Sequence, residues 1–555
     1  MSFEQLKSKG HDVPPKIYNP PGRDSNNRGI GPFHGLATFS VLCLGVILAG
    51  CVSLRRDVPR PFSEAWMLPE QTAIGREVGV QLAGHDGKSG FRLLGSGLEA
   101  LSLRAGLAEN AQHTLDLQYF TLHEDITTHL LLYRVLRAAN RGVRVRLLID
   151  DFYAGGKDFD LSTFSTHPNI EARVFNPFLQ RGTLGLFRLL EFVSDYKRLN
   201  RRMHNKLWIA DNAVAIVGGR NLGDQYFDAH SEINFTDLDI LAAGPVVREL
   251  SRSFDEYWNS EWAVPVRAFV FNPPGPEDLV RFERILETRL RDFRDSVYAQ
   301  ALREVRLGPQ FLSGQLTLTP AYATVLYDKP EKTPIGDGDE PSRRIFSPRL
   351  RSMIEAAENE VILISPYFIP SEQGIGILGA LARRGVRVRI LTNSLASTDA
   401  PMVHAGYTGV RDRLLAAGVE IYEMRPNEPP KARRSWKSGA SSGASLHAKL
   451  VMVDRRQVLI GSMNLDPRSR LHNTEVALLL ESAQIGADLA SLFEEAVRPE
   501  RSFRLMLTGT APEKRTILWI TEEDSREIRY EREPAGFWRR FFSRVLSSLT
   551  PDELL

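Results

Sequence analysis

Cysteine is scarce in this chain of 555 residues: there are only two, Cys43 and Cys51, both near the N-terminus. The rest of the chain therefore cannot form a disulfide, bind a metal through sulfur or supply a thiol nucleophile. A surplus of one charge is also missing, because 70 Lys and Arg face 68 Asp and Glu, for a net charge of +2. This balance argues against a protein that binds nucleic acid along its phosphates, since such proteins usually carry a basic surplus.

Long hydrophobic runs are absent apart from one short stretch near the N-terminus. Residues Gly35–Gly50 are uncharged, but this run is shorter than the ~20 residues of a transmembrane helix. It follows a basic segment and ends in Leu48-Ala49-Gly50-Cys51, which resembles a bacterial lipoprotein signal. We therefore expect residues 1–50 to be a signal peptide and Cys51 to carry the lipid. The alternative is an uncleaved anchor helix that continues through residues 52–54.

The expected location follows from this signal. A lipid on Cys51 would hold the body at a membrane of the bacterial cell envelope, facing the periplasm. The residue after the cysteine is Val52 and not aspartate, which weakly favours the outer membrane.

The remaining chain contains an internal duplication. The hexapeptide Arg141–Arg146 recurs as Arg384–Arg389, and His204-Asn205-Lys206 recurs as His447-Ala448-Lys449, both at an offset of 243 residues. In each copy, apolar runs with strand character alternate with amphipathic helical stretches. This alternation predicts an α/β fold in which two mainly parallel sheets, flanked by helices, form a bilobal body with pseudo-twofold symmetry.

The duplication also sets the expected domain boundaries. In chain order we expect a signal peptide (1–50), a linker (51–88), a first domain (89–265), a helical connector with a loop (266–345), a second domain (346–500), and a C-terminal strand with an amphipathic tail (501–555).

Each copy carries the same polar motif. The first reads His204-x-Lys206-x4-Asp211-x6-Gly218-Gly219-Arg220-Asn221, and the second reads His447-x-Lys449-x4-Asp454-x6-Gly461-Ser462-Met463-Asn464. Residues i and i+2 of a strand point to one side, so each histidine and its lysine project together. If the copies pair about a twofold axis, two His, two Lys and two Asn converge on one cavity.

That set of side chains is suited to binding and cleaving a phosphodiester. Lys206, Lys449, Asn221 and Asn464 would hold the phosphoryl oxygens, one imidazole would attack phosphorus, and the other would protonate the leaving oxygen. We expect no metal and no cofactor, because the two lysines supply the positive charge that a metal would supply.

The doubled motif resembles that of the phospholipase D superfamily, and its surroundings (GRNLGDQYF, and NTE after GSMNLDPRS) are most similar to the bacterial cardiolipin synthases of the C type. The resemblance implies a phosphohistidine intermediate, with His204 as nucleophile and His447 as acid. It also implies a carboxylate that orients each histidine, and by position these are Asp237 and Glu475, with Asp239 a competitor of Asp237. Residues expected to be structural are Asp211, Asp454, Gly218, Gly219, Gly461 and Ser462.

The expected function is therefore a membrane-tethered phosphatidyl transferase that makes cardiolipin from phosphatidylglycerol and a second phospholipid. Its expected partners are the phospholipid substrate and the membrane surface, without nucleic acid. Three alternatives stay open: a phospholipase D that releases phosphatidic acid, a phosphodiesterase or nuclease of the same superfamily, and a membrane scaffold without activity.

Three further segments bear on membrane contact. Leu184–Val193 is apolar and is either a lip that accepts acyl chains or a core helix. Residues 427–446 are polar and are expected to form a mobile loop at the mouth of the cleft. Phe537–Leu549 has helical apolar spacing with basic residues and is either an interfacial helix or a helix docked on the body.

Overall fold

The computed structural model describes most of the chain after residue 54. The described residues are 55, 57–153, 156–179, 185–270, 272–332, 346–426, 444–509, 515–537 and 539–541. The chain divides into a unit Met1–Cys51 and a unit Val52–Leu555, and only the second contains described residues. The predicted signal peptide (residues 1–50), Cys51, residues 427–443 and most of the predicted C-terminal helix lie outside the described residues.

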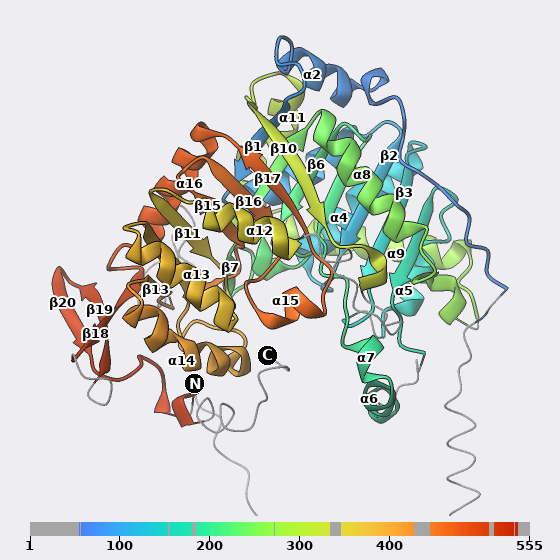
Figure 1. Cartoon of the computed structure of the whole chain (residues 1–555). Coiled ribbons are helices and arrows are strands. Elements are labelled where there is room, and N and C mark those ends of the chain that lie inside the picture. Colours follow the sequence, from blue (N-terminus) through green and yellow to red (C-terminus); the bar gives the residue numbers. More distant parts are fainter. Residues whose placement is uncertain are drawn as a thin grey trace, which may run out of the picture. The chain divides into compact units, whose positions relative to one another are not determined.

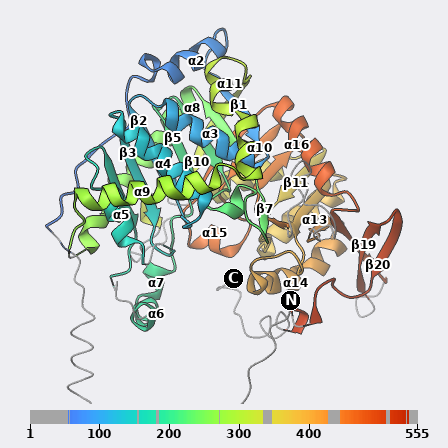
Figure 2. The ribbon, with the colours of Figure 1, turned by 180° about the vertical axis from the view of Figure 1, so that it is seen from behind.

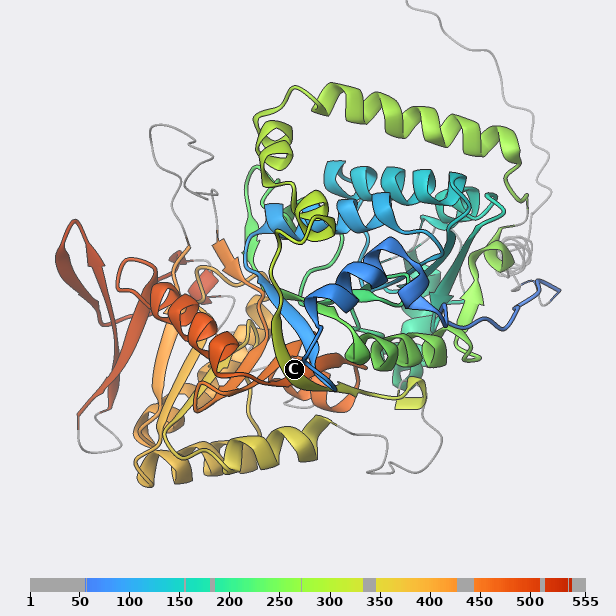
Figure 3. The same cartoon turned by 90° about the horizontal axis from the view of Figure 1, so that it is seen from above.

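The first half contains a mixed sheet with helices on both faces (Figures 1 and 3). Its elements are β1 (Ser89–Leu94), α3 (Gly97–Asn110), β2 (Thr114–Tyr119), α4 (Ile126–Asn140), β3 (Arg144–Asp150), α5 (Asp158–Phe164), β4 (Ile170–Phe175), α6 (Gly185–Ser194), α7 (Tyr196–Leu199), β5 (Leu207–Ala210), β6 (Val214–Gly218), β7 (Asn234–Thr236), β8 (Asp239–Ala243), α8 (Pro245–Trp258) and β9 (Ala263–Pro265). Strands joined by helices pair in parallel, β2 with β3 and β3 with β4. Strands β5, β6, β8 and β1 pair antiparallel.

The second half repeats this plan. Its elements are β10 (Thr319–Tyr327), α12 (Phe346–Glu355), β11 (Glu360–Ile364), α13 (Glu372–Arg383), β12 (Arg387–Asn393), α14 (Pro401–Ala416), β13 (Glu420–Met424), β14 (Ala444–Leu446), β15 (Leu450–Val453), β16 (Gln457–Gly461), α15 (Pro467–Leu471), β17 (Val476–Glu481), α16 (Ala483–Ala496) and β18 (Ser502–Thr508). Strands β11, β12 and β13 pair in parallel, β14 pairs in parallel with β7 of the first half, and the other pairs are antiparallel. The α/β class is confirmed, but the expectation of mainly parallel sheets is wrong. Tight hairpins such as β15–β16 reverse the chain and enforce antiparallel pairing.

The two halves share one continuous sheet. β1 pairs antiparallel with β10, Gly90 lying opposite Pro320, and β10 pairs with β17. From this seam the pairing order outward is β1-β8-β6-β5-β2-β3-β4-β9 on one side and β10-β17-β16-β15-β11-β12-β13-β18 on the other. The order is therefore symmetric about the seam. β10 lies within the range 266–345 that the sequence analysis treats as a connector.

Helices cover the sheet and define its cores. In the first half α3 and α4 pack on one face, α9 (Pro276–Phe293) packs outside α4, and α8 covers the other face (Figures 2 and 3). The apolar sides of α8 and α16 join strands of both halves in one buried cluster that includes Phe254 and Phe493. This shared core fixes the two halves against each other.

The repeated Arg-Gly pair ends a helix in each half. Gly142 follows α4 with φ of 100°, and Gly385 follows α13 with φ of 87°. These left-handed angles favour glycine and stop the helix before the next strand. In that strand Arg146 pairs with Asp116 in the first half, and Arg389 pairs with Glu360 in the second.

The remaining described elements lie outside the two repeats, except η2, which follows β6 within the first repeat. They are η1 (Pro69–Gln71), α2 (Ala73–Gln81), η2 (Asp224–Tyr226), η3 (Val266–Phe269), α10 (Val297–Val305), α11 (Leu307–Leu312), η4 (Pro330–Lys332), β19 (Thr516–Glu523) and β20 (Arg526–Tyr530). β18, β19 and β20 form a meander at the edge of the second half (Figure 1).

Candidate active site

Short backbone ladders between the halves position both histidines. β14, which ends one residue before His447, pairs in parallel with β7 of the first half, and Met203 forms an equivalent bridge with Thr474. The His204 amide donates to the Thr474 carbonyl at 2.9 Å, and the His447 amide donates to the Thr236 carbonyl at 2.8 Å. Each histidine is thus held against the segment of the other half that carries an acidic residue.

The acidic residues bind the histidines crosswise. Nδ1 of His204 lies 2.9 Å from Glu475 Oε2, and Nδ1 of His447 lies 2.6 Å from Asp237 Oδ2. All four side chains are buried. Because each Nδ1 faces a carboxylate, it carries the proton, and Nε2 is left as the reactive nitrogen of the neutral ring.

Asp239, the competitor of Asp237, has other partners. Its carboxylate lies 2.8 Å from Arg104 Nη2 and 3.5 Å from Arg220 Nη1. Both arginines are buried, so Asp239 balances their charge inside the first half while Asp237 faces His447.

Each lysine lies beside its histidine, and the charge of Lys449 acts on Lys206. Lys206 Nζ donates to the His204 carbonyl at 2.6 Å, and Lys449 Nζ donates to the His447 carbonyl. Burial lowers the pKa of Lys206 to about 7, with Lys449 adding to the effect and Glu475 opposing it. Burial likewise lowers the pKa of Lys449 to about 8, against the attraction of Asp237. An anionic ligand would restore the full charge of both ammonium groups.

The imidazoles are shifted toward the neutral form. Burial lowers the pKa of His204 to about 4, although Glu475 opposes the shift. Burial and Lys449 also lower the pKa of His447, with Asp237 opposing them. Aromatic rings contribute to this burial: Phe120 packs edge-on against His204, and Tyr226 and Phe235 pack against His447. A neutral, desolvated imidazole is suited to nucleophilic attack.

The small residues of the motif make room for the carboxylates. A Cβ atom on Gly219 would lie 2.2 Å from Asp237 Oδ1, and one on Gly218 would lie 2.0 Å from Asp239 Oδ1. In the second half Ser462 takes the place of Gly219, and its hydroxyl donates to Glu475 at 2.5 Å. Gly461 packs against backbone, because a Cβ there would meet the Val476 carbonyl at 2.2 Å.

The two motif aspartates lie at the far end of the hairpins. Asp211 accepts the backbone amides of residues 112–114, and Asp454 accepts those of residues 358–360. Asp211 therefore fixes the start of β2, and Asp454 fixes the start of β11. Neither carboxylate contacts an imidazole.

The two asparagines differ in their availability. The side-chain oxygen Oδ1 of Asn221 accepts from the Thr121 backbone amide at 3.2 Å, and the side-chain N–H of Asn221 donates to the Tyr226 hydroxyl at 3.1 Å. Asn464 Oδ1 is buried without a hydrogen-bond partner among the described residues. A phosphoryl oxygen can only accept hydrogen bonds, so it would be held by the side-chain N–H of Asn464 and not by this oxygen.

Sequence reasoning missed the two residues whose side chains accept the backbone amide just before each histidine. Asp150 accepts the Met203 amide at 2.8 Å, and Asn393 accepts the Leu446 amide at 2.8 Å. Both end the duplicated Arg-Val-Arg strand, and they are related by the same offset of 243 residues. Extending the repeat register to the ends of these strands would have found them.

A second missed group lies behind Glu475. The Glu475 amide donates to Asp328 at 3.1 Å, Asp328 pairs with Lys332 at 2.7 Å, and Ser469 donates to Glu475 Oε1 at 2.7 Å. Lys332 also donates to the Ser469 carbonyl at 3.0 Å. Asp328 and Lys332 belong to the range 266–345, which was expected to be a connector, and no motif in the sequence marks them.

The segment 184–193 is not a core helix. Its described residues belong to α6 (Gly185–Ser194), which lies beside α7 (Figure 1), and Leu189, Leu190 and Val193 are 57%, 55% and 68% exposed. At the C-terminus Arg539 donates to the carbonyls of Ala396 and Thr398, so the start of the tail is docked on the second half. No helix among the described residues combines the length and apolar character needed to cross a bilayer.

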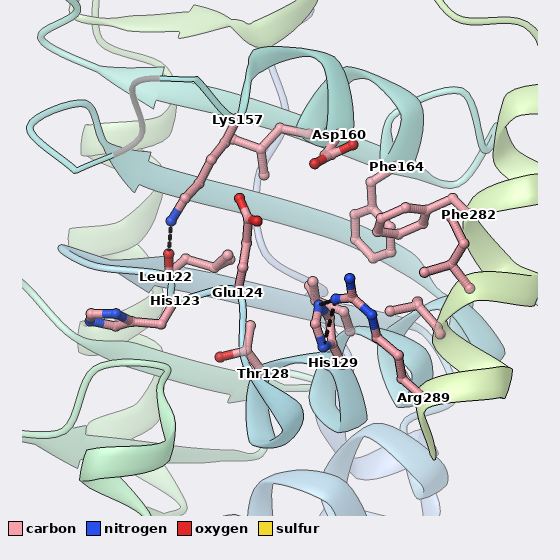
Figure 4. A pocket seen from close by; sticks show the side chains of 14 residues that line it. Leu122, His123, Glu124, Thr128, His129, Lys157, Asp160, Phe164, Phe282 and Arg289 are labelled. Atoms are coloured by element: carbon pink, nitrogen blue, oxygen red, sulfur yellow. Dashed lines mark hydrogen bonds between the residues drawn. The ribbon is translucent and has the colours of Figure 1, made fainter. Parts of the chain in front are cut away.

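A pocket of about 140 Å³ lies in the first half between α4, α5 and α9 (Figure 4). Lys157 donates there to the Leu122 carbonyl, and Arg289 donates to His129. Glu124 and Asp160 face the same space. None of the motif residues lines this pocket, so it is separate from the paired histidines.

The two repeated regions of this chain also match a known protein family. A family model described as "Cardiolipin synthase, PLD-like domain" matches residues 106–258 and 350–497. The chain is 38% identical over 476 residues to cardiolipin synthase C of Escherichia coli (strain K12), covering 85% of this chain and 97% of that protein. It is 25% identical over 391 residues to cardiolipin synthase A of Yersinia pestis bv. Antiqua (strain Angola), covering 70% and 65%. The crystal structure of phosphatidylserine synthase from Haemophilus influenzae Rd KW20 has a TM-score of 0.53 at 13% identity, covers 87% of this chain and all of that one, and shares the fold.

Proposed function

The chain belongs to the cardiolipin synthase family of PLD-like proteins, and from this premise we propose that it is a phosphatidyl transferase that forms cardiolipin. Phosphatidylglycerol is the acceptor, and a second phospholipid donates the phosphatidyl group. The observation that carries the proposal is the crosswise pairing of two buried histidines with Glu475 and Asp237, with a lysine beside each.

In the first step His204 Nε2 attacks the phosphorus of the donor. An N–P bond forms, the P–O bond to the headgroup alcohol breaks, and His447 Nε2–H gives its proton to the departing oxygen. The low pKa of His204 keeps its lone pair available. The phosphodiester anion raises the pKa of His447 when it binds beside it, which supplies the proton for this step.

In the second step the phosphohistidine is resolved. His447, now neutral, takes the proton from the terminal hydroxyl of phosphatidylglycerol as the oxygen attacks phosphorus. The new O–P bond forms, the N–P bond breaks, and His204 is regenerated. Lys206, Lys449 and Asn464 stabilise the charge on the phosphoryl oxygens in both steps. Asp237 and Glu475 orient the rings and stabilise each imidazolium.

Attachment to a membrane of the cell envelope is part of the proposal. The lipoprotein-type signal ending at Cys51 would tether the body on the periplasmic side. The exposed apolar residues of α6, Leu189, Leu190 and Val193, supply a surface that fits the bilayer interface. Replacing Cys51 by alanine should release the protein from the membrane fraction, whereas unchanged fractionation would favour an uncleaved anchor.

Product analysis on defined lipids tests the activity. Purified protein with labelled phosphatidylglycerol, with and without phosphatidylethanolamine and in excess chelator, should yield cardiolipin. Phosphatidic acid as the sole product would identify a phospholipase D instead. Labelled phosphorus trapped on His204 would support the nucleophile assignment, and label on His447 would reverse it.

A further inference from the structure

A long apolar groove lies in the second half beside the catalytic motif. It has a volume of about 430 Å³, within the range of ligand sites, and lies between α12, α13 and the segment that follows β16. Its apolar walls include Leu350, Ile354, Ile369, Ile377, Met463 and Leu465. Ile354, Ile369 and Ile377 are only half-buried, so the groove is open along one side.

The groove adjoins the active site through one segment of chain. Met463, Leu465 and Asp466 line it, and Asn464 lies between them. A smaller cavity of about 10 Å³ shares Leu350, Met463 and Leu465 with the groove and is lined on its other side by Lys449. The groove therefore lies next to the segment that carries Asn464 and is separated from Lys449 by this small cavity.

The charges that line the groove fit an anionic lipid. Arg351 and Arg470 both line it. Arg351 already pairs with Glu355 at 2.8 Å, whereas the side chain of Arg470 has no hydrogen-bond or ion-pair partner among the described residues. Asp466 is buried, and burial raises its pKa to about 7. Asp466 is therefore partly protonated near neutral pH, so it repels a bound anion less. An apolar groove whose lining includes the unpaired side chain of Arg470 matches a hydrocarbon chain attached to a phosphate.

We propose that this groove binds one acyl chain of the phospholipid whose phosphate lies between Lys206 and Lys449. The inference rests on the proposed function, because it takes its ligand from that reaction. It assigns to α12 and α13 a role in recognising the length of the chain. Burying a methylene group releases free energy in proportion to the apolar area removed from water, so long-chain lipids gain an advantage that short-chain lipids lack.

Filling the groove tests this inference. Ile377→Trp places an indole in the groove, and Leu492→Trp, an exposed position on α16, is the matched control. With the wild type and Leu492→Trp, kcat/KM in mixed micelles should be at least about tenfold higher for lipids with 16-carbon chains than for lipids with 8-carbon chains. Ile377→Trp should reduce this ratio to within about threefold, through a loss of kcat/KM on the long-chain lipid. An unchanged ratio in a folded Ile377→Trp protein would overturn the proposal.

Photolabelling provides a readout that needs neither a variant nor turnover. Phosphatidylglycerol with a diazirine at the end of one acyl chain should label peptides within residues 348–378 or 463–470 of the wild-type protein. Label confined to α6 or to the first half would also overturn the proposal. Release of phosphatidic acid in place of cardiolipin would refute the proposed function, and the label and the chain-length ratio would still decide the groove.

Discussion

Two aspartates in neighbouring positions, Asp237 and Asp239, have separate tasks. Asp237→Asn removes the charge that faces His447 at 2.6 Å, so we expect kcat to fall by about 10²–10⁴-fold with little change in stability. Asp239→Asn leaves the buried Arg104 without its partner, so the free energy of unfolding should fall by about 3–5 kcal/mol. Steady-state kinetics and urea unfolding of both variants separate the two effects. A stable but inactive Asp239→Asn would reverse the assignment.

The lysines predict the pH dependence of the reaction. Lys206 and Lys449 have pKa values lowered by burial to about 7 and about 8, and the free enzyme loses their charge as the pH rises through this range. We therefore expect the loss of charge on the lysines between pH 7 and 8 to add to the decline of kcat/KM that begins as His447, the proton donor, loses its proton. In acid, kcat/KM should fall near pH 4, where His204 takes up a proton. The alkaline decline of kcat should occur at higher pH, because the bound phosphate raises the pKa of both lysines. A kcat/KM that stays flat to pH 9 would contradict this.

At the scale of elements, the strand β10 and the turn after it support the catalytic carboxylate. Asp328 and Lys332 hold the Glu475 backbone and the Ser469 carbonyl. We expect Lys332→Met to lower kcat about tenfold, because Glu475 would lose the alignment that orients His204, with a smaller change in KM. Lys329→Met is the matched control, since Lys329 pairs with Glu256 and is partly exposed. Equal losses in the two variants would show that only folding is affected.

Sequence reasoning predicted elements best where the repeat was strong. The Arg-Gly turns, the strands after them and the histidine hairpins all follow local patterns, and they recur at one offset. β10 was missed because it lies outside the motifs that recur in the two copies, and its partners, β1 and β17, are distant in the chain. The antiparallel strands were missed because alternation with helices suggested parallel crossovers, while β5–β6 and β15–β16 are hairpins.

At the scale of the whole molecule, the duplicated motif predicted that two histidines meet but not which carboxylate each would bind. The crosswise pairs depend on the ladders between β7 and β14 and between Met203 and Thr474, which only the packed halves create. The polar character of Asp237 and Glu475 could be recognised in the sequence. Their partners could not, because the contacts span 210 and 271 residues.

The crosswise pairing also predicts that one chain builds one complete site. His204 and Glu475 belong to the same chain, as do His447 and Asp237, and the β1–β10 seam joins the halves within that chain. His204→Ala and His447→Ala should each abolish turnover, and mixing or co-expressing the two variants should restore none, because every chain still lacks one imidazole. Phosphatidyl transfer by the mixture is the measurement, with a wild-type sample diluted to one quarter as the reference. Recovery approaching that reference would mean that halves are exchanged between chains, and the site would then be shared by a dimer.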